Sequence, residues 1–183
     1  ARIVGDDGQD VAQGETGELW VRGRAILQGY YHRPEANASS FVGDWFRTGD
    51  LMYQDEKGYF FFVSRIKDMI RRSGENIAAI EVEFVLSEMP GIAEAAVIPV
   101  PDKLRGEEVK AFVVLDEGMT NDDLNPEKII AHCGSHLAPF KVPRYVKYID
   151  ALPLTTSEKI AKGQLKDNDS PEGTYDRQVK GWL

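Results

Sequence analysis

The sequence has little cysteine, little histidine and no long apolar run. Cys133 is the only cysteine among 183 residues, so the chain can form neither an internal disulfide nor a cysteine metal cluster. No apolar run approaches the ~20 residues of a membrane-spanning helix, and the sequence shows no secretory signal peptide. We therefore expect a cytoplasmic protein without a transmembrane segment.

Histidine is also too scattered to indicate a metal site. His132 and His136 lie four residues apart on a predicted helix and could present two ligands on one face. They lack a companion carboxylate such as the glutamate of the H-E-x-x-H pattern. We interpret the pair as part of a solvated helix face and expect no metal site.

Positive charge is in deficit. The chain has 22 Lys and Arg against 30 Asp and Glu, which gives a formal net charge of −8. Phosphate contacts need clustered cations, so this balance argues against a nonspecific nucleic-acid-binding protein and a nucleic-acid partner. It is compatible with a local basic site for a nucleotide. Hydrophobic residues make up 42% of the chain, enough for a globular core.

The pattern of apolar and polar residues predicts two structured regions and a tail. Residues 1–64 alternate as β-strands separated by glycine turns do. Residues 65–166 predict a helix, two strands, a helix and a strand. That order favours an α+β domain with a three-stranded sheet covered by helices. Residues 167–183 are polar and predict a loosely attached tail, which Tyr175 and Trp182 could dock.

Within the second region, the first helix is predicted at residues 78–88. Ile77, Ile80 and Phe84 follow the i, i+3, i+7 spacing and are expected to form its buried face. The second helix is expected to begin at Asn125-Pro126, a capping side chain followed by proline. The three strands are predicted at residues 92–100, 108–115 and 144–149.

The stretch between residues 45 and 77 joins the two regions. It contains a turn at Thr48-Gly49-Asp50, an apolar hairpin, and then four cations in the nine residues from Ser64 to Arg72. A second glycine turn follows at residues 73–76. An apolar hairpin that leads into a short charged connector is typical of the exit from one domain and the entry to another.

The chain contains three long motifs in order, FRTGDL (46–51), SRIKDMIRRSGENIAAIEVE (64–83) and LPLTTSEKIAK (152–162). They resemble motifs of the adenylate-forming enzymes, and in particular the ATP-dependent acyl-CoA synthetases. The resemblance covers nearly all of residues 1–166. It implies that residues 1–64 are the β-rich end of the large N-terminal adenylating domain and that residues 65–166 are the mobile C-terminal domain. We thus expect the C-terminal portion of a longer enzyme.

The resemblance also implies a reaction. The full-length enzyme would use ATP with Mg²⁺ to activate a carboxylic acid as acyl-AMP and would then transfer the acyl group to coenzyme A. The phosphate loop and the acyl pocket of the family are absent from this sequence. We therefore expect the chain alone to be inactive and to bind no cofactor tightly, and the acid is not indicated. The alternatives are an adenylation domain that loads a carrier protein, and a non-catalytic interaction module.

Lys159 is the candidate catalytic residue. Adenylation moves negative charge onto the α-phosphate and pyrophosphate, and a flexible ammonium can stabilise that charge as it develops. The resemblance places the adenylation lysine of the family at this position. Glu158 replaces the glycine that precedes this lysine in the family, so the loop loses a residue that tolerates positive φ. Without the motif, a solvated surface lysine is the default interpretation.

Asp50 and Arg65 match the residues that bind the ribose of ATP in the family. A carboxylate can accept hydrogen bonds from the two ribose hydroxyls, and a guanidinium can donate to their oxygens. On residue type alone, Asp50 could instead stabilise its own turn, and Arg65 could form a surface ion pair with Asp68.

Lys67 matches the hinge position of the family, where the linker changes its dihedral angles between the two half-reactions. Gly74 matches a loop that lines the pantetheine tunnel in CoA ligases, although an ordinary hairpin would also need glycine. Glu81 and Glu83 are interpreted as helix-face residues. Weaker candidates for contacts with CoA are the cations and the aromatic residue Arg71, Arg72, Arg105, Phe140 and Lys141.

Overall fold

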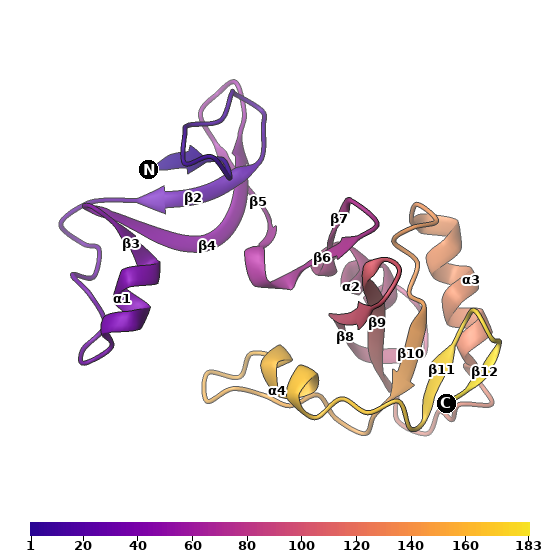
Figure 1. Ribbon diagram of the computed structural model, residues 1–183. Helices are drawn as coiled ribbons and strands as arrows, with labels where there is room; N and C mark the ends of the chain where they lie inside the picture. The colour runs from indigo at the N-terminus through magenta and orange to yellow at the C-terminus, as the bar shows by residue number, and fades with distance from the viewer. The chain divides into compact units, whose positions relative to one another are not determined.

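The computed structural model describes residues 1–183, and the chain divides into two compact units, Ala1–Lys67 and Asp68–Leu183. Figure 1 labels the helices and strands of both units. None of the helices is long and apolar enough to cross a membrane.

The first unit is built on a five-stranded antiparallel sheet in which β1, β2, β4 and β3 follow one another and β5 pairs with β4. The β-rich character predicted for this region is confirmed, and one short helix, α1 (Pro34–Ser40), accompanies the sheet. A turn at Asp55 joins β4 to β5, because its carboxylate accepts hydrogen bonds from the backbone N–H groups of Lys57 and Tyr59. The strands are β1 (Arg2–Val4), β2 (Gly17–Val21), β3 (Phe41–Val42), β4 (Trp45–Gln54) and β5 (Phe60–Arg65).

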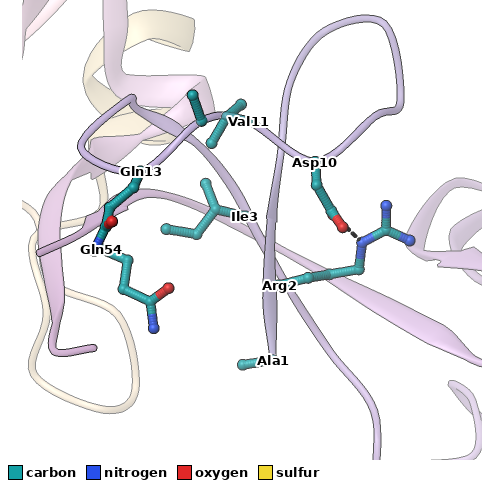
Figure 2. A pocket seen from close by; sticks show the side chains of 8 residues that line it. Ala1, Arg2, Ile3, Asp10, Val11, Gln13 and Gln54 are labelled. Carbon is teal, nitrogen blue, oxygen red and sulfur yellow. Dashed lines mark hydrogen bonds and ion pairs between the residues drawn. The ribbon is translucent and has the colours of Figure 1, made fainter. Parts of the chain in front are cut away.

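A cavity of about 480 Å³ opens beside β1, and Figure 2 shows the side chains that line it. Its charged groups are already paired, because Arg2 forms an ion pair with Asp10. Gln13 donates a hydrogen bond to the carbonyl oxygen of Asp55. None of the candidate site residues lines this cavity.

The second unit is an α+β structure, as predicted, but its sheet is larger than expected. The three predicted strands are present as β8 (Ile92–Asp102), β9 (Gly106–Leu115) and β10 (Tyr145–Tyr148). They belong to a seven-stranded sheet in which β12, β11, β10, β9, β6 and β7 follow one another and β8 pairs with β9. The additional strands are β6 (Met69–Arg72), β7 (Glu75–Ala78), β11 (Thr174–Asp176) and β12 (Gly181–Trp182).

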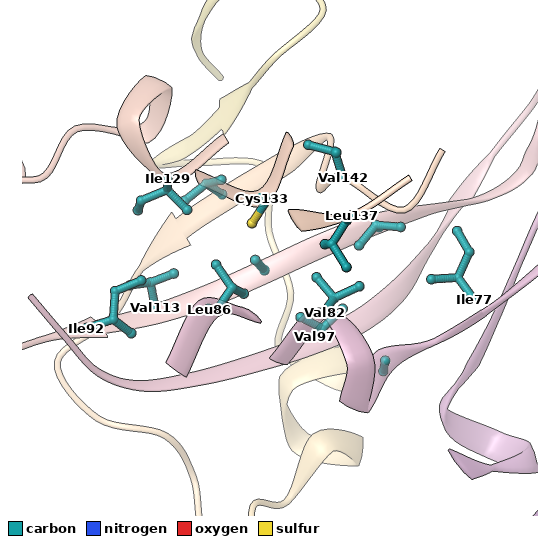
Figure 3. Close-up of a cluster of buried hydrophobic side chains, with 14 of the residues drawn as sticks. Ile77, Val82, Leu86, Ile92, Val97, Val113, Ile129, Cys133, Leu137 and Val142 are labelled. Carbon is teal, nitrogen blue, oxygen red and sulfur yellow. The ribbon is translucent and has the colours of Figure 1, made fainter. Parts of the chain in front are cut away.

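Two apolar clusters cover opposite faces of this sheet, because successive side chains of a strand point to opposite sides. The larger cluster joins the sheet to α2 (Ala79–Ser87) and α3 (Pro126–His136), and Figure 3 shows its members. The smaller cluster joins it to α4 (Lys162–Asp167) through Leu165. The predicted start of α3 is confirmed, because the Asn125 side chain accepts a hydrogen bond from the Lys128 backbone.

The predicted buried face of α2 is wrong. The helix begins at Ala79, so Ile77 is buried as expected but lies in β7, and the buried helix residues are Ala79, Val82 and Leu86. Ile80 is 46% exposed and Phe84 is 64% exposed. Apolar residues occur all around this helix, so their spacing alone did not single out one face.

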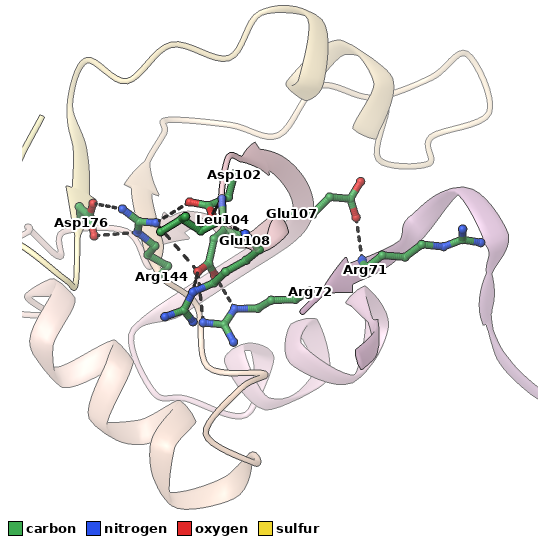
Figure 4. A network of polar contacts seen from close by, with 9 residues as sticks. Arg71, Arg72, Asp102, Leu104, Glu107, Glu108, Arg144 and Asp176 are labelled. Atoms are coloured by element: carbon green, nitrogen blue, oxygen red, sulfur yellow. Dashed lines mark hydrogen bonds and ion pairs between the residues drawn. The ribbon is translucent and has the colours of Figure 1, made fainter. Parts of the chain in front are cut away.

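The loosely attached tail is a second correction. β11 and β12 extend the sheet beside β10, and Thr174, Tyr175 and Asp176 are buried. Their polar side chains can be buried because they are paired. Arg144 holds the Asp176 carboxylate with two hydrogen bonds (Figure 4), and Lys110 donates a hydrogen bond to the Thr174 hydroxyl.

Candidate active site

Asp50 and Arg65 lie opposite each other on β4 and β5. Arg65 Nε is 2.9 Å from Asp50 Oδ1, so Arg65 pairs with Asp50 and not with Asp68 as one alternative proposed. The carboxylate of Asp50 also accepts no backbone hydrogen bond, which removes the turn-stabilising alternative. Its Oδ1 is buried and accepts no hydrogen bond, although the guanidinium lies beside it.

The turn before Asp50 is held by neighbouring side chains. The Thr48 hydroxyl accepts a hydrogen bond from the Asp50 backbone N–H at 3.1 Å and donates to the carbonyl oxygen of Leu19 at 2.7 Å. Buried Glu18 accepts from the Gly49 backbone at 3.0 Å and pairs with Arg47 at 2.9 Å. Glu18 therefore supports the turn, a role that the sequence analysis missed, since a glutamate in an alternating strand is usually exposed.

The candidate hinge residue lies where the two units meet in the sequence. Lys67 is the last residue of the first unit and belongs to a short 3-10 helix, Ile66–Asp68. A short helical turn of this kind has few backbone hydrogen bonds to break when its dihedral angles change.

Lys159 lies near the tip of a narrow loop between β10 and α4. The loop is closed by hydrogen bonds from Thr155 N to Lys159 O at 2.7 Å and from Ala161 N to Pro153 O at 2.7 Å. The Lys159 side chain is exposed and forms no ion pair within this structure. Glu158 has a φ of +59°, so the substitution keeps the left-handed backbone for which the glycine of the motif is suited.

An ion pair connects α2 to the residue that follows this loop, Lys162 at the start of α4. Lys162 follows Lys159 by three residues, and its Nζ is 2.7 Å from Glu83 Oε1. The sequence analysis interpreted Glu83 as a helix-face residue. The signal that could have indicated the contact is the pairing of two motifs, since Glu83 ends the second motif and Lys162 ends the third.

The β6–β7 hairpin carries Gly74 with a φ of +86°, next to Ser73 with a φ of +52°. A Cβ atom on Gly74 would meet no other atom within 4 Å, so the positive φ, and not crowding, calls for glycine here. The hairpin interpretation therefore accounts for this glycine within the unit.

The structure corrects the candidate role of Arg72. Its side chain is 8% exposed and binds Glu108, which is fully buried, at 2.7 and 3.1 Å (Figure 4). A guanidinium that neutralises a buried carboxylate cannot leave it without a large cost. Arg105 lies 3.3 Å from the same carboxylate but is 37% exposed, so part of it can reach a ligand.

The other weak candidates form a separate group. Lys141 Nζ lies 2.7 Å from Glu81 of α2 and 5.8 Å from the centre of the Phe140 ring. Arg71 has an exposed side chain, and its backbone N–H donates to Glu107 at 2.7 Å. Arg72 and Arg105 thus share the Glu108 carboxylate, and Lys141 lies beside the Phe140 ring. The structure shows no contact between these two groups.

The two helix histidines use ring nitrogens in local contacts. His132 Nε2 lies 3.0 Å from the carbonyl oxygen of Val85, and His136 Nδ1 lies 2.9 Å from that of His132. His132 thus helps to pack α3 against α2.

Comparison with known proteins shows what this chain is similar to. Residues 81–159 match the AMP-binding enzyme C-terminal domain, and Lys159 is the last residue of the match. The match includes most of α2, all of α3 and the sheet strands β8, β9 and β10.

Relatives and solved structures extend this similarity beyond the AMP-binding C-terminal domain. The chain is 41% identical over 175 residues to the long-chain-fatty-acid–CoA ligase of Yersinia pestis, covering 96% of this chain and 30% of the relative. It is 41% identical over 170 residues to the crotonobetaine/carnitine–CoA ligase of Proteus mirabilis, covering 91% and 32%. The ATP-bound crystal structure of MatB from Rhodopseudomonas palustris superposes with a TM-score of 0.81 at 35% identity, covering 91% and 33%. The chain thus spans about a third of the length of these proteins.

Proposed function

We propose that this chain is the C-terminal part of an ATP-dependent acyl-CoA synthetase. The parent enzyme activates a carboxylic acid as acyl-AMP with release of pyrophosphate, and then transfers the acyl group to CoA with release of AMP. ATP enters as its Mg²⁺ complex, which is a substrate. Support comes from the two relatives, which are named CoA ligases, and from the ATP-bound MatB structure.

The structural observation that carries the proposal is the pairing of Asp50 with Arg65 across β4 and β5. The Asp50 side chain is 22% exposed although its Oδ1 is buried, so a ligand hydroxyl can approach the rest of the carboxylate. The vicinal hydroxyls of a ribose are suitable donors. Arg65 pairs with this carboxylate and can also donate hydrogen bonds to the ribose oxygens.

Lys159 supplies positive charge in the adenylation step. As the acid oxygen attacks the α-phosphate, negative charge grows on the phosphate oxygens and on the departing pyrophosphate. An exposed ammonium on a narrow loop, with no internal ion pair to give up, is suited to meet that charge. Arg72 and Lys141 of the same unit are instead paired with carboxylates.

The thioester step requires the same site to admit the thiol of CoA. We assign the hinge to Lys67 because the two units divide immediately after it. Gly74, exposed at its hairpin tip, would approach the pantetheine arm, and Arg105, Phe140 and Lys141 are candidates for contacts with the nucleotide of CoA. Arg72 is not among these candidates, since its side chain is paired with buried Glu108.

The acid is not determined by these residues. The two relatives share the same identity with this chain, 41%, yet their names refer to a long-chain fatty acid and to crotonobetaine or carnitine. The part of the enzyme described here is thus compatible with different acids, and the residues that select the acid lie elsewhere in the parent.

The test is to express the parent enzyme and to measure acid-dependent ATP–pyrophosphate exchange and CoA thioester formation over a panel of acids. We expect both activities with at least one acid. Lys159→Ala should lower exchange by roughly 100-fold or more, as does loss of one charge-stabilising group in other enzymes, and should spare thioester formation from a preformed acyl-adenylate. Exchange without thioester would support carrier loading instead, and neither activity would support an interaction module.

A further inference from the structure

The Glu83 carboxylate forms a charged contact at the end of the loop that carries Lys159. Glu83 Oε1 lies 2.7 Å from Lys162 Nζ, and the two side chains are only 17% and 16% exposed. The same oxygen accepts a hydrogen bond from the backbone N–H of Val97 at 2.7 Å. Val97 is fully buried in β8, so the sheet fixes the carboxylate and the carboxylate fixes the lysine.

Both ends of the loop are anchored, but its tip is not. Leu152 before the loop and Leu165 after it are 5% and 7% exposed in the smaller apolar cluster. Between them, the hydrogen bonds of residues 155–159 join only residues of the loop itself. Lys162 is therefore the charged contact nearest to Lys159 that ties the loop to the sheet and α2.

We infer that Glu83 is a positioning residue for Lys159 and acts through Lys162. The inference rests on the proposed role of Lys159 in adenylation. Charge stabilisation in a transition state depends on placement, and a misplacement of about 1 Å can reduce the rate by roughly 100-fold. A mostly buried, charge-assisted contact is strong enough to hold the base of the loop in one place.

The same helix provides a matched control. Glu81 and Lys141 form an ion pair of the same 2.7 Å length, with the carboxylate also on α2, but it fastens the segment around Phe140. Its side chains are more exposed, at 44% and 22%. Lys141→Met therefore removes a cation paired with α2, as Lys162→Met does, without releasing the Lys159 loop.

The first test needs no activity. Amide hydrogen exchange of the 183-residue chain should be measured for Lys162→Met, Lys162→Arg and Lys141→Met. We expect Lys162→Met to speed exchange at Thr155 and Ala161 by at least about tenfold while β8 and β9 stay protected. Lys162→Arg and Lys141→Met should resemble the native chain. Unchanged exchange in Lys162→Met, or the same increase in Lys141→Met, would overturn the positioning role.

The second test uses the parent enzyme and separates the half-reactions. We expect Lys162→Met and Glu83→Ala to lower kcat of ATP–pyrophosphate exchange by about tenfold or more, with thioester formation from preformed acyl-adenylate retained. Lys162→Arg keeps the positive charge, so it should retain ATP–pyrophosphate exchange. Equal loss of both half-reactions would mean a general structural role and would overturn the inference. If the wild-type parent shows no adenylation, the proposed function fails. The amide hydrogen-exchange measurement on the 183-residue chain still decides whether Lys162 holds the loop.

Discussion

Arg65 lies directly across the strand pair from Asp50, with its Nε 2.9 Å from an Asp50 oxygen that accepts no hydrogen bond. The charge of the carboxylate is therefore balanced, whereas its hydrogen-bonding capacity is not used. The Asp50 side chain is nevertheless 22% exposed, so a ligand hydroxyl can approach the part of the carboxylate that Arg65 does not cover.

The first prediction concerns this pair. In the parent enzyme, Asp50→Ala and Arg65→Ala should each lower kcat/KM for ATP by roughly 10- to 100-fold, since a hydrogen bond to a charged group contributes about 1.5–3 kcal/mol. The ATP dependence of pyrophosphate exchange measures this. Arg2→Gln, which breaks the ion pair with Asp10 in the same unit, is the control and should leave the ATP dependence unchanged. If both Asp50→Ala and Arg65→Ala match the control, the ribose role is wrong.

The second prediction concerns the hinge. Lys67→Pro fixes φ near −65° at the last residue of the first unit. If the linker must change its dihedral angles between the half-reactions, this variant should retain one of them and lose most of the other. Lys67→Ala removes the side chain but keeps the backbone free, so it should perform both. Equal retention of the two half-reactions in Lys67→Pro would exclude a hinge at this residue.

Much of the candidate site could be predicted because motifs preserve the order of residues along the chain. The strand pairing that brings Asp50 to Arg65 follows from a hairpin, which is a local structure, and the Asn125 cap of α3 is also local. Local signals of this kind depend on a few neighbouring residues, so a single sequence contains them.

The parts that could not be predicted depend on contacts between distant residues. Arg72 and Glu108 lie 36 residues apart, and Arg144 and Asp176 lie 32 apart, so no spacing rule indicates either pair. A polar residue is expected at the surface until its partner is known. For this reason the sequence alone favours a ligand-binding role for Arg72 and a loose tail around Asp176.

The third prediction addresses the substituted glycine before Lys159. A non-glycine residue at a φ of +59° carries backbone strain of roughly 1–2 kcal/mol. Glycine removes this strain from the folded chain, but it also gives the unfolded chain more conformational freedom, which offsets part of the gain. Glu158→Gly should therefore be more stable than Glu158→Ala, by up to about 1 kcal/mol in urea unfolding. Both variants remove the carboxylate, so their difference isolates the backbone. A more stable Glu158→Ala would show that the loop is not strained.

The fourth prediction is a pH dependence caused by Cys133. Burial raises the pKa of this thiol from 9.0 to about 11, so the folded chain holds the proton more tightly than the unfolded chain. This contribution is complete below pH 9 and is lost as pH rises towards 11, an effect of roughly 2–3 kcal/mol. The free energy of unfolding should thus fall more steeply between pH 9 and 11 in the native chain than in Cys133→Ala. If the free energy of unfolding changes in parallel with pH in the two proteins, the prediction is wrong. The cavity left by Cys133→Ala lowers stability by the same amount at every pH, so it does not affect this comparison.

The last prediction tests whether the C-terminal strands belong to the fold. Arg144 binds Asp176 with two hydrogen bonds, at 3.2 and 3.0 Å, and also pairs with Asp102, so it joins β10, β11 and the end of β8 (Figure 4). The Asp176 side chain is 4% exposed. Asp176→Ala leaves the guanidinium with one fewer partner at a mostly buried position, and breaking a pair of this kind costs about 3 kcal/mol.

Urea unfolding of the 183-residue chain measures this change, with Lys141→Ala as the control. Lys141 pairs with Glu81 nearer the surface, so its removal should cost less than about 1 kcal/mol. The midpoint of Asp176→Ala should therefore fall well below that of Lys141→Ala, with the same slope against urea if the rest of the sheet still unfolds as one unit. Equal midpoints would mean that β11 contributes little, in which case the Asp176 pairing does not hold the C-terminal segment in the sheet.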